Sequence, residues 1–291
     1  MSELLQFLLS GIAAGGIYAL VAVGFVTVYN VLGIINFAQG EFAMLGALVA
    51  ASLVAHGVPL VAAAPLAILA AAAVGALVER GVLGPAQASS EVVRIIITIG
   101  VSISLRGVAL TIWSSQSYGL PQFSEGAPLT ILGAALALQN FWVLGTAAVI
   151  MAALFLLFDR TYFGSALRAS VMNRDASRLM GISPARMSLY AYSLSAALGA
   201  TAGVVIAPIS LATYDMGIML GLKGFVAAVM GGLVSAPGAV AGALLLGVLE
   251  SFAAGLVSSG YKDAIAFALL LGVLVVRPTG LFSGVAASRQ V

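Results

Sequence analysis

The chain contains no cysteine and few charged residues, with 12 lysines and arginines and 10 aspartates and glutamates in 291 residues. The lack of cysteine excludes disulfides, thiolate metal sites and cysteine nucleophiles. His56 is the single histidine, so the sequence predicts no metal site and offers no nucleophile–base set for an enzyme. The net charge of +2 is too small to indicate a nucleic-acid partner.

Two further absences concern energy coupling and the N-terminus. The sequence has no G-x-x-x-x-G-K-[ST] loop, and neither Lys223 nor Lys262 follows a glycine. We therefore expect no ATP site of that kind on this chain. Residues 1–16 carry no lysine or arginine ahead of their apolar run, whereas a cleaved signal peptide has a basic flank. This segment is expected to be retained as the first span.

Apolar residues are in large excess. The chain is 62% hydrophobic and 8% charged, and its mean hydropathy is +1.16. An ordinary soluble domain is about 45–50% apolar and about 25% charged. A lipid-facing exterior accounts for this excess, because it removes the need for a polar surface. The composition predicts an all-α polytopic membrane protein, which we interpret as a single transmembrane domain over residues 1–291.

Long apolar runs place the expected helices, since a spanning helix needs about 20 largely apolar residues. A shorter run, Phe225–Val234, lies between Gly224 and Pro237 and predicts half a span or a re-entrant hairpin. The expectation is a bundle of eight or nine transmembrane helices with broken or re-entrant segments. The eight clear runs are Leu4–Tyr29, Phe42–Ala55, Leu60–Val78, Ile95–Trp113, Phe141–Phe158, Met187–Ala207, Ala239–Val257 and Ala264–Val276.

The arginines predict an orientation. They gather in the loops 80–94 and 160–186 and in the tail with Arg277 and Arg289, and such basic segments face the cytoplasm. The long loop 114–139 carries no lysine or arginine and is expected outside. Counting spans then places the N-terminus outside and the C-terminus in the cytoplasm. Parity favours the short run as a true crossing, which gives nine.

Small residues four positions apart predict close helix contacts inside lipid. Chance spacing is the open alternative, because the chain has 34 glycines. The four pairs are Gly11/Gly15, Gly199/Gly203, Gly217/Gly221 and Gly238/Gly242.

The segment 164–186 predicts a short helix on the cytoplasmic face. Ser165 is suited to begin a helix of about four turns and Gly181 to end it, and Ser183-Pro184 is a second start signal. The helix would rest on anionic lipid or dock in a groove of a soluble partner, and the spacing alone leaves both open. One predicted side carries Ala169, Met172, Ala176, Leu179 and Met180; the other carries Ser170, Arg174, Ser177 and Arg178, with Leu167 and Val171 among them.

Three stretches resemble one family, the permeases of branched-chain amino-acid ABC importers. Gly15–Gly24 with Asn36–Phe42 resembles the opening of the H-type subunit, and Leu222–Gly232 resembles its late signature region. The third stretch resembles the family's coupling segment, which engages the ATP-binding subunit. Its matching residues are Arg168, Ala169, Asn173, Ala176, Leu179, Met180, Gly181 and Ile182.

This resemblance implies a bacterial inner-membrane permease subunit with a type II importer-like bundle. It also implies a second related permease, two cytosolic ATPases and a periplasmic amino-acid-binding protein as partners. ATP and Mg²⁺ would bind to the ATPases, leaving this chain without a cofactor and without catalysis. The implied substrates are leucine, isoleucine and valine, although relatives carry other amino acids, amides or urea.

Polar residues within spans are functional candidates, because they are costly in lipid. Asn36, Gln39 and Glu41 surround Gly40 between the first two spans, and the alternative is that they cap helix ends. Arg106 and Glu250 are deep, opposite charges, and we hypothesise that they pair. The candidate translocation-path residues are Tyr18, Asn36, Gln39, Glu41, Gly231 and Gly232.

Two other function classes compete with an ABC permease. A secondary transporter coupled to protons or sodium places carboxylates at the membrane centre. This chain offers chiefly Glu250, so that class ranks second. An intramembrane enzyme or a structural protein ranks last, since no nucleophile and base stand together in the sequence.

Overall fold

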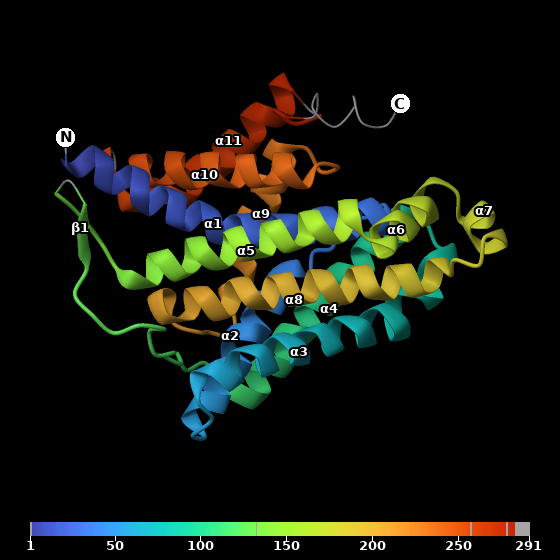
Figure 1. Ribbon diagram of the computed structural model, residues 1–291, viewed down its shortest axis with the longest axis horizontal. Coiled ribbons are helices and arrows are strands. Elements are labelled where there is room, and N and C mark those ends of the chain that lie inside the picture. The colour runs from blue at the N-terminus through green and yellow to red at the C-terminus, as the bar shows by residue number, and fades with distance from the viewer. Residues whose placement is uncertain (1, 132, 257, 278, 283–291) are drawn as a thin grey trace.

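The computed structural model describes residues 2–131, 133–256, 258–277 and 279–282, which are mainly helical (Figure 1). Each of the eight clear apolar runs is helical over its described residues, and the shorter run Phe225–Val234 is helical only as far as Gly231. Val257 and Arg289, which were assigned to a span end and to the cytoplasmic tail, lie outside the described residues. The elements in chain order are α1 (Ser2–Leu32), α2 (Gln39–Ala55), α3 (Leu60–Val78), η1 (Glu79–Leu83), η2 (Pro85–Ala88), α4 (Glu91–Trp113), β1 (Leu129–Ile131), β2 (Ala134–Leu136), α5 (Leu138–Arg160), α6 (Tyr162–Met172), α7 (Arg174–Leu179), α8 (Pro184–Ser210), α9 (Met216–Gly231), α10 (Ala236–Leu256), η3 (Ser259–Tyr261) and α11 (Lys262–Val276).

Within the described part of the chain, seven helices are long and apolar enough to cross a membrane. They are α1, α3 continued by η1, α4, α5, α8, α10 and η3–α11. Two shorter apolar helices, α2 and α9, complete the bundle. Strands β1 and β2 form an antiparallel hairpin in the loop before α5, and Tyr118 in the same loop pairs with Ala212 after α8. Figure 1 shows this hairpin at the end of the bundle opposite to α6 and α7.

Glycines hold the core helices together at very short range. Gly11 and Gly15 face the backbone of α10, and Gly199 and Gly203 face the first turns of α2. A Cβ at Gly11, Gly15 or Gly203 would overlap a neighbouring backbone, so these contacts require glycine, while a Cβ at Gly199 would fit tightly against α2. The pairs Gly217/Gly221 and Gly238/Gly242 likewise lie at the contacts of α9 with α2 and with α10. Chance spacing was the open alternative for these pairs, and the structure places all four of them at helix contacts.

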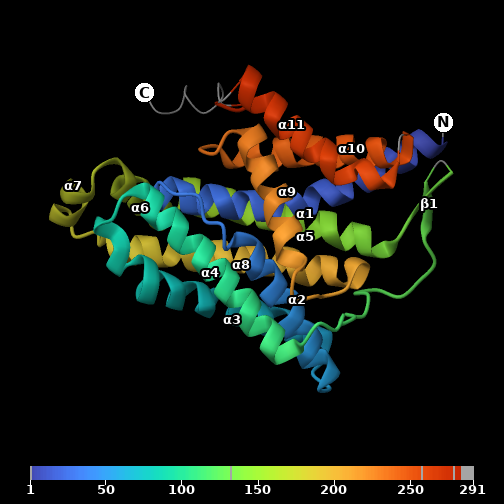
Figure 2. The same cartoon turned by 180° about the vertical axis from the view of Figure 1, so that it is seen from behind.

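Helix α9 lies across α1 instead of running along it (Figures 1 and 2). Its start contacts Gly40, and farther on Gly224 packs against Val21 of α1. The helix ends at Gly231, and Gly232 has a φ of +91° that suits glycine. The backbone N–H of Leu281 donates to Met230 O at 2.8 Å, so the segment after α11 closes this end. The helical chain is therefore interrupted between α9 and α10, near the end of the short apolar run Phe225–Val234.

The segment 164–186 contains two helices before α8, and the prediction of a single helix from Ser165 to Gly181 is wrong. Chain direction changes at Asn173, whose φ of −153° and ψ of 105° are extended. This residue begins a second helix with its own side chain, because asparagine at such a position accepts bonds from the next amides. The first helix begins at Thr161 in place of Ser165. The Gly181 end, with a φ of +80°, and the Ser183-Pro184 start of α8 are confirmed.

Candidate functional site: an exposed docking segment and buried polar clusters

The residues 161–185, which we name the docking segment, comprise α6, α7 and the turn into α8. Helix α6 is anchored by its first turn, where the Gly164 N–H donates to Thr161 Oγ1 at 3.3 Å. Gly164 lies directly against the Phe158 backbone at the end of α5, a contact that leaves no room for a side chain. Leu167 is buried among Val31 of α1 and Ala191 of α8. The segment is therefore fixed to three spanning helices.

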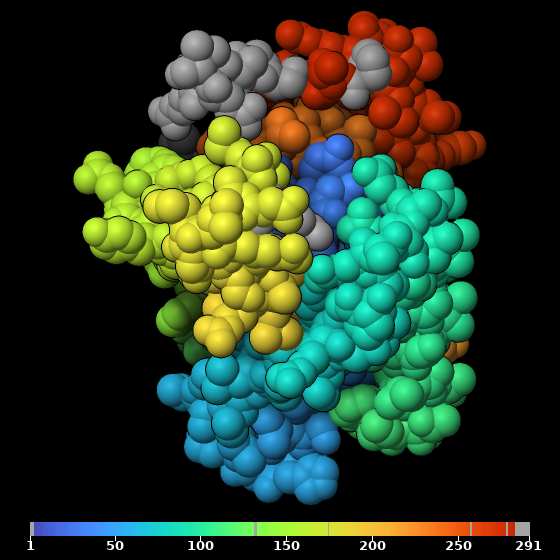
Figure 3. All heavy atoms as spheres, turned by 90° about the vertical axis from the view of Figure 1, so that its right-hand side faces the viewer, coloured from blue at the N-terminus to red at the C-terminus, as the bar shows by residue number. Residues whose placement is uncertain are grey.

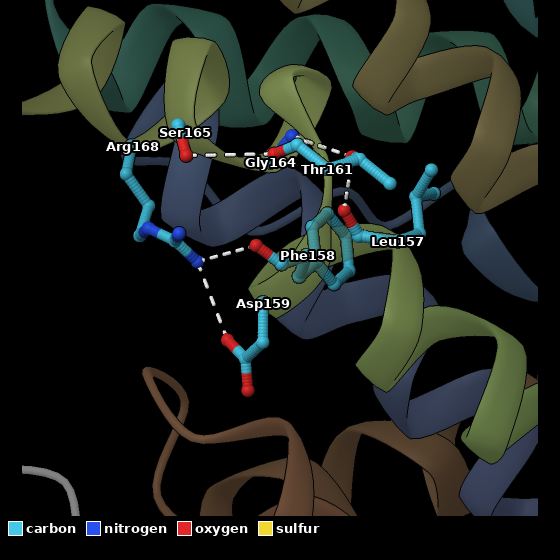
Figure 4. A network of polar contacts seen from close by, with 7 residues as sticks. All are labelled: Leu157, Phe158, Asp159, Thr161, Gly164, Ser165 and Arg168. Carbon is cyan, nitrogen blue, oxygen red and sulfur yellow. Dashed lines mark hydrogen bonds and ion pairs between the residues drawn. The ribbon is translucent and has the colours of Figure 1, made fainter.

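Arg168 fastens the corner between α5 and α6 (Figure 4). Its Nη1 donates to the Phe158 carbonyl at 2.6 Å and lies 3.3 Å from Asp159 Oδ1. The carbonyl is one of those left unpaired at the end of a helix, and a cationic donor there is favourable. Arg168 is therefore a residue that fixes this corner.

Helix α7 and the turn after it are also held by local bonds. Asn173 Oδ1 accepts from the N–H groups of Asp175 and Ala176 at 3.1 and 3.0 Å. The Ile182 N–H donates to Ser177 O at 2.9 Å, which closes the turn at Gly181. A shallow groove of about 380 Å³ lies beside this turn. Its lining residues are Arg178, Gly181, Ile182, Ser183, Pro184 and Ala185.

Large apolar side chains of the docking segment lie in the open. Met172, Leu179 and Met180 are 86%, 89% and 81% exposed, and Figure 3 views the end of the molecule where this segment stands forward. The predicted division of faces needs a correction, because Ser170 and Ser177 are buried. The buried hydroxyl of Ser170 is satisfied by Leu167 O at 2.8 Å, while the apolar side points outward. Such a rigid, exposed apolar group is typical of a binding surface.

The polar residues Asn36 and Gln39 are fully buried and join helices. Tyr192 of α8 donates its hydroxyl to Asn36 Oδ1 at 2.7 Å. Gln39 Nε2 donates to the Ser195 carbonyl at 3.0 Å, and the Ser195 hydroxyl lies within hydrogen-bonding distance of both Gln39 Oε1 and the Gly24 carbonyl. These bonds tie α1, α2 and α8 together.

Glu41 is the residue that Arg106 contacts, and the predicted Arg106–Glu250 pair is wrong. Arg106 Nε lies 3.2 Å from Glu41 Oε1, which also accepts from the Ser102 hydroxyl at 2.9 Å. The reason is geometric: α2 lies between α8 and α4, so a carboxylate of its first turn reaches α4. Glu250 belongs to α10, on the far side of α1 (Figures 1 and 2).

Glu250 instead belongs to a cluster of four charges that the sequence reasoning missed. Lys223 Nζ lies 2.5 Å from Glu250 Oε1 and 2.8 Å from Asp263 Oδ1, and Lys262 lies 3.3 Å from Glu250. Lys223 also stands over the ring of Tyr18, 5.7 Å from its centroid. Lys223 itself could have predicted this cluster from the sequence. It lies in the middle of an apolar run, and a cation in such a place needs a partner of opposite charge.

The remaining path candidates lie in packed surroundings. Tyr18 is 5% exposed under Lys223. Gly231 faces the Gly238 backbone, and Gly232 ends α9. No group of three or more histidines, aspartates and glutamates that would hold a metal occurs in the described segments.

Comparison with known proteins assigns the family. The model of the family described as "Branched-chain amino acid transport system / permease component" matches residues 7–274. The branched-chain amino-acid permease BraD of Pseudomonas aeruginosa is 34% identical over 95% of both chains. The permease LivH of Escherichia coli K12 is 34% identical over 95% of this chain and 94% of its own length. The chain belongs to this permease family.

More distant relatives agree with the fold. The ribose import permease RbsC of Escherichia coli K12 is 30% identical over 80% of the permease described here and 73% of its own length. A solved structure, PsaBC from Streptococcus pneumoniae in complex with Fab, shares 16% identity and a TM-score of 0.50 over 99% of this chain and 96% of that one. The all-helical polytopic membrane fold is thereby shared with a solved structure.

Family membership decides between the competing function classes. The permease is the membrane component of an ABC-type branched-chain amino-acid transport system, which makes ATPase and binding-protein partners necessary. It is a multi-pass, non-catalytic subunit without a cofactor of its own. The secondary-transporter and enzyme interpretations are therefore wrong. The role of each site residue stays a prediction.

Proposed function

We propose that this permease carries branched-chain amino acids inward across a bacterial inner membrane. Transport is driven by ATPases that bind its docking segment. The complex contains a second related permease, two cytosolic ATPases that bind ATP and Mg²⁺, and a periplasmic binding protein. The relatives named as branched-chain permeases are more similar and cover more of the chain than the ribose permease, which supports this substrate class.

One observation carries the coupling proposal: three large apolar side chains lie exposed on a segment whose backbone is held rigidly. Met172, Leu179 and Met180 have no covering neighbour, yet α7 has its cap from Asn173 and its closing turn at Gly181. Burying exposed apolar area contributes about 25 cal/mol per Å². The segment is thus prepared to enter a groove of an ATPase without first having to fold.

Motion of the docking segment reaches the membrane through two spans. Arg168 links α6 to the end of α5, and Ser183 accepts from the Arg186 N–H at the start of α8. A displacement of the segment would therefore shift α5 and α8 together, which changes access to the solute path. The proposed coupling contacts are Arg168, Ala169, Asn173, Ala176, Leu179, Gly181 and Ile182, and the proposed path residues are Tyr18, Asn36, Gln39, Glu41, Gly231 and Gly232.

The proposed topology has nine crossings within a single type II importer-like domain. The seven long helices and the shorter α2 and α9 supply them. The N-terminus and the β1–β2 hairpin lie outside, and the docking segment and the chain after α11 lie in the cytoplasm. The arginines of residues 160–186 support this orientation.

The test is leucine uptake into proteoliposomes that hold the complete transporter. Replacing Leu179 and Met180 by aspartate together should abolish ATP-driven uptake and release the ATPases, while the permease remains folded. The matched control is Leu129→Asp in β1, an exposed leucine at the opposite end that is 50% exposed. Uptake that persists without ATP in the wild type, driven by an ion gradient, would overturn the proposal.

A further inference from the structure

Helix α9 begins at the depth of the bundle centre. Gly217 in its first turn packs against Gly40, the residue before Glu41. Glu41 in turn binds Ser102, which is the central residue of α4 (Glu91–Trp113). The residues between Ala212 and Met216 therefore run from the loop after α8 toward the middle of the bundle, where α9 starts. A helix that starts within the membrane presents unpaired N–H groups and a positive dipole end there.

Three charged groups gather around this start. Arg106 extends from α4 with 27% of its side chain exposed, while Glu41 beneath it is 2% exposed. Glu41 Oε2 has no hydrogen-bond partner among the described residues, and a side chain placed on Gly217 would meet this oxygen. Asp215 immediately precedes α9, is exposed and makes no side-chain bond to cap the helix.

This cluster differs from the Lys223 cluster in its balance of charges. There two lysines stand with two carboxylates, Glu250 and Asp263, so the four charges sum to zero. At the start of α9 a single guanidinium stands with two carboxylates, and one oxygen of Glu41 lacks a partner among the described residues. An accessible guanidinium near the centre of a spanning helix is unfavourable against lipid, so this face borders water, solute or protein.

Apolar side chains adjoin the charges. Ile218 and Met219 follow Asp215 in the first turn of α9, and each is 38% exposed. Ile103, one turn before Arg106 on the same face of α4, is 58% exposed. Aliphatic side chains therefore lie exposed on the same two elements, α4 and the start of α9, that carry the charges.

We propose that this region is a transient subsite for a zwitterionic, aliphatic amino acid on its way through the permease. The Arg106 guanidinium, aided by the start of α9, receives the α-carboxylate. Asp215 and the free oxygen of Glu41 receive the α-ammonium, and Ile218 and Met219 contact the branched side chain. The inference rests on the proposed function and names the groups of this chain that the solute meets.

The experiment uses the complete transporter in proteoliposomes and counts labelled L-leucine imported per ATP hydrolysed. Asp215→Asn keeps the size of an exposed side chain and removes its charge. The expected result is a fall of about tenfold in leucine per ATP, with ATP hydrolysis retained, because one charge-assisted contact is lost. Glu125→Gln, an exposed carboxylate of the outer loop, is the matched control and should leave the ratio unchanged.

An unchanged leucine-to-ATP ratio in Asp215→Asn would overturn the subsite. Full recovery of uptake in the charge-swapped double variant Glu41→Arg with Arg106→Glu would also overturn the subsite. An ion pair that only holds α2 against α4 is restored by such an exchange, whereas a binding site for the solute is not. Wild-type uptake that does not need ATP would defeat the proposed function instead. In that case the rate of leucine uptake tests the subsite: a lower rate in Asp215→Asn than in the wild type would support it, and an equal rate would overturn it.

Discussion

The glycine-packed core and the docking segment are built in opposite ways. In the core, Gly15 and Gly203 bring helices into backbone contact. Of the residues in the most apolar stretch of α1, 89% are buried. In the docking segment, Leu179 and Met180 are held out into the open by a capped helix. The core helices are packed against one another within this chain, whereas large apolar side chains of the docking segment lie uncovered. We therefore expect substitutions in the core to unfold the permease, and substitutions in the docking segment to weaken ATPase binding without unfolding it.

The largest expected effect is at the core. Gly203→Leu places a side chain where the Ala43 backbone lies, so α2 and α8 must separate and the folded permease should be lost from the membrane. The measurement is the monodisperse fraction after detergent extraction. Gly145→Leu on α5, where no atom lies within 4 Å of an added Cβ, is the control and should fold normally. Equal behaviour of the two variants would refute the packing account.

The buried charge cluster should come next. Lys223→Met leaves Glu250 without its shortest ion pair, and breaking a buried pair costs about 3–5 kcal/mol. We expect a clear fall in the thermal midpoint of the purified protein. The double variant Lys223→Met with Glu250→Leu should recover much of this loss. Additive losses in the double variant would contradict direct pairing.

A third change sharpens the contrast at the docking segment. Leu179→Asp should weaken ATPase binding about 30-fold, the effect of losing an interface residue worth about 2 kcal/mol, while the thermal midpoint stays the same. Tyr162→Ser, which removes another fully open side chain at the start of α6, tests whether the effect is specific to α7. A lowered midpoint with unaltered ATPase affinity would place Leu179 in the fold instead.

The smallest effect is expected from the cap of α7. Asn173→Ala removes the acceptor for the Asp175 and Ala176 amides, a loss of about 1 kcal/mol for the helix. Hydrogen exchange at those two amides should become faster by about fivefold. Exchange in α8 should not change, since Ser183 caps that helix separately. Unaltered exchange at Ala176 would show that the cap does not hold α7.

Local chemistry made most of the fold predictable. Hydrophobic runs located the helices, spacing located Gly11/Gly15 and the other contact pairs, and Ser183-Pro184 marked the start of α8. The sequence analysis named Asn173 only for its resemblance to the family's coupling segment and missed its role as the cap of α7. The residues around it continue a helical pattern, so the change of chain direction that makes it a cap is visible only in the structure.

The side-chain partners were harder to predict. Arg106 and Glu250 were predicted to need partners of opposite charge, and each has one. Their partners depended on which helices are neighbours, and that is decided by the glycine contacts and by the path of α9 across α1. Lys223 shows the same limit, since its acids come from two later helices. Charge and depth can be read along a chain, but pairing requires the three-dimensional arrangement.

The most direct measurement uses the natural absence of cysteine. A single cysteine in place of Ala176, which is exposed on α7, should cross-link to the ATPase subunit in the assembled transporter. An impermeant thiol reagent should reach it only after the membrane is opened. A cysteine at the exposed Ala127, in the loop that we propose to lie outside, should instead react in intact cells and give no cross-link. Labelling of the Ala176 position from outside, or failure to cross-link while ATP still drives uptake, would contradict the account.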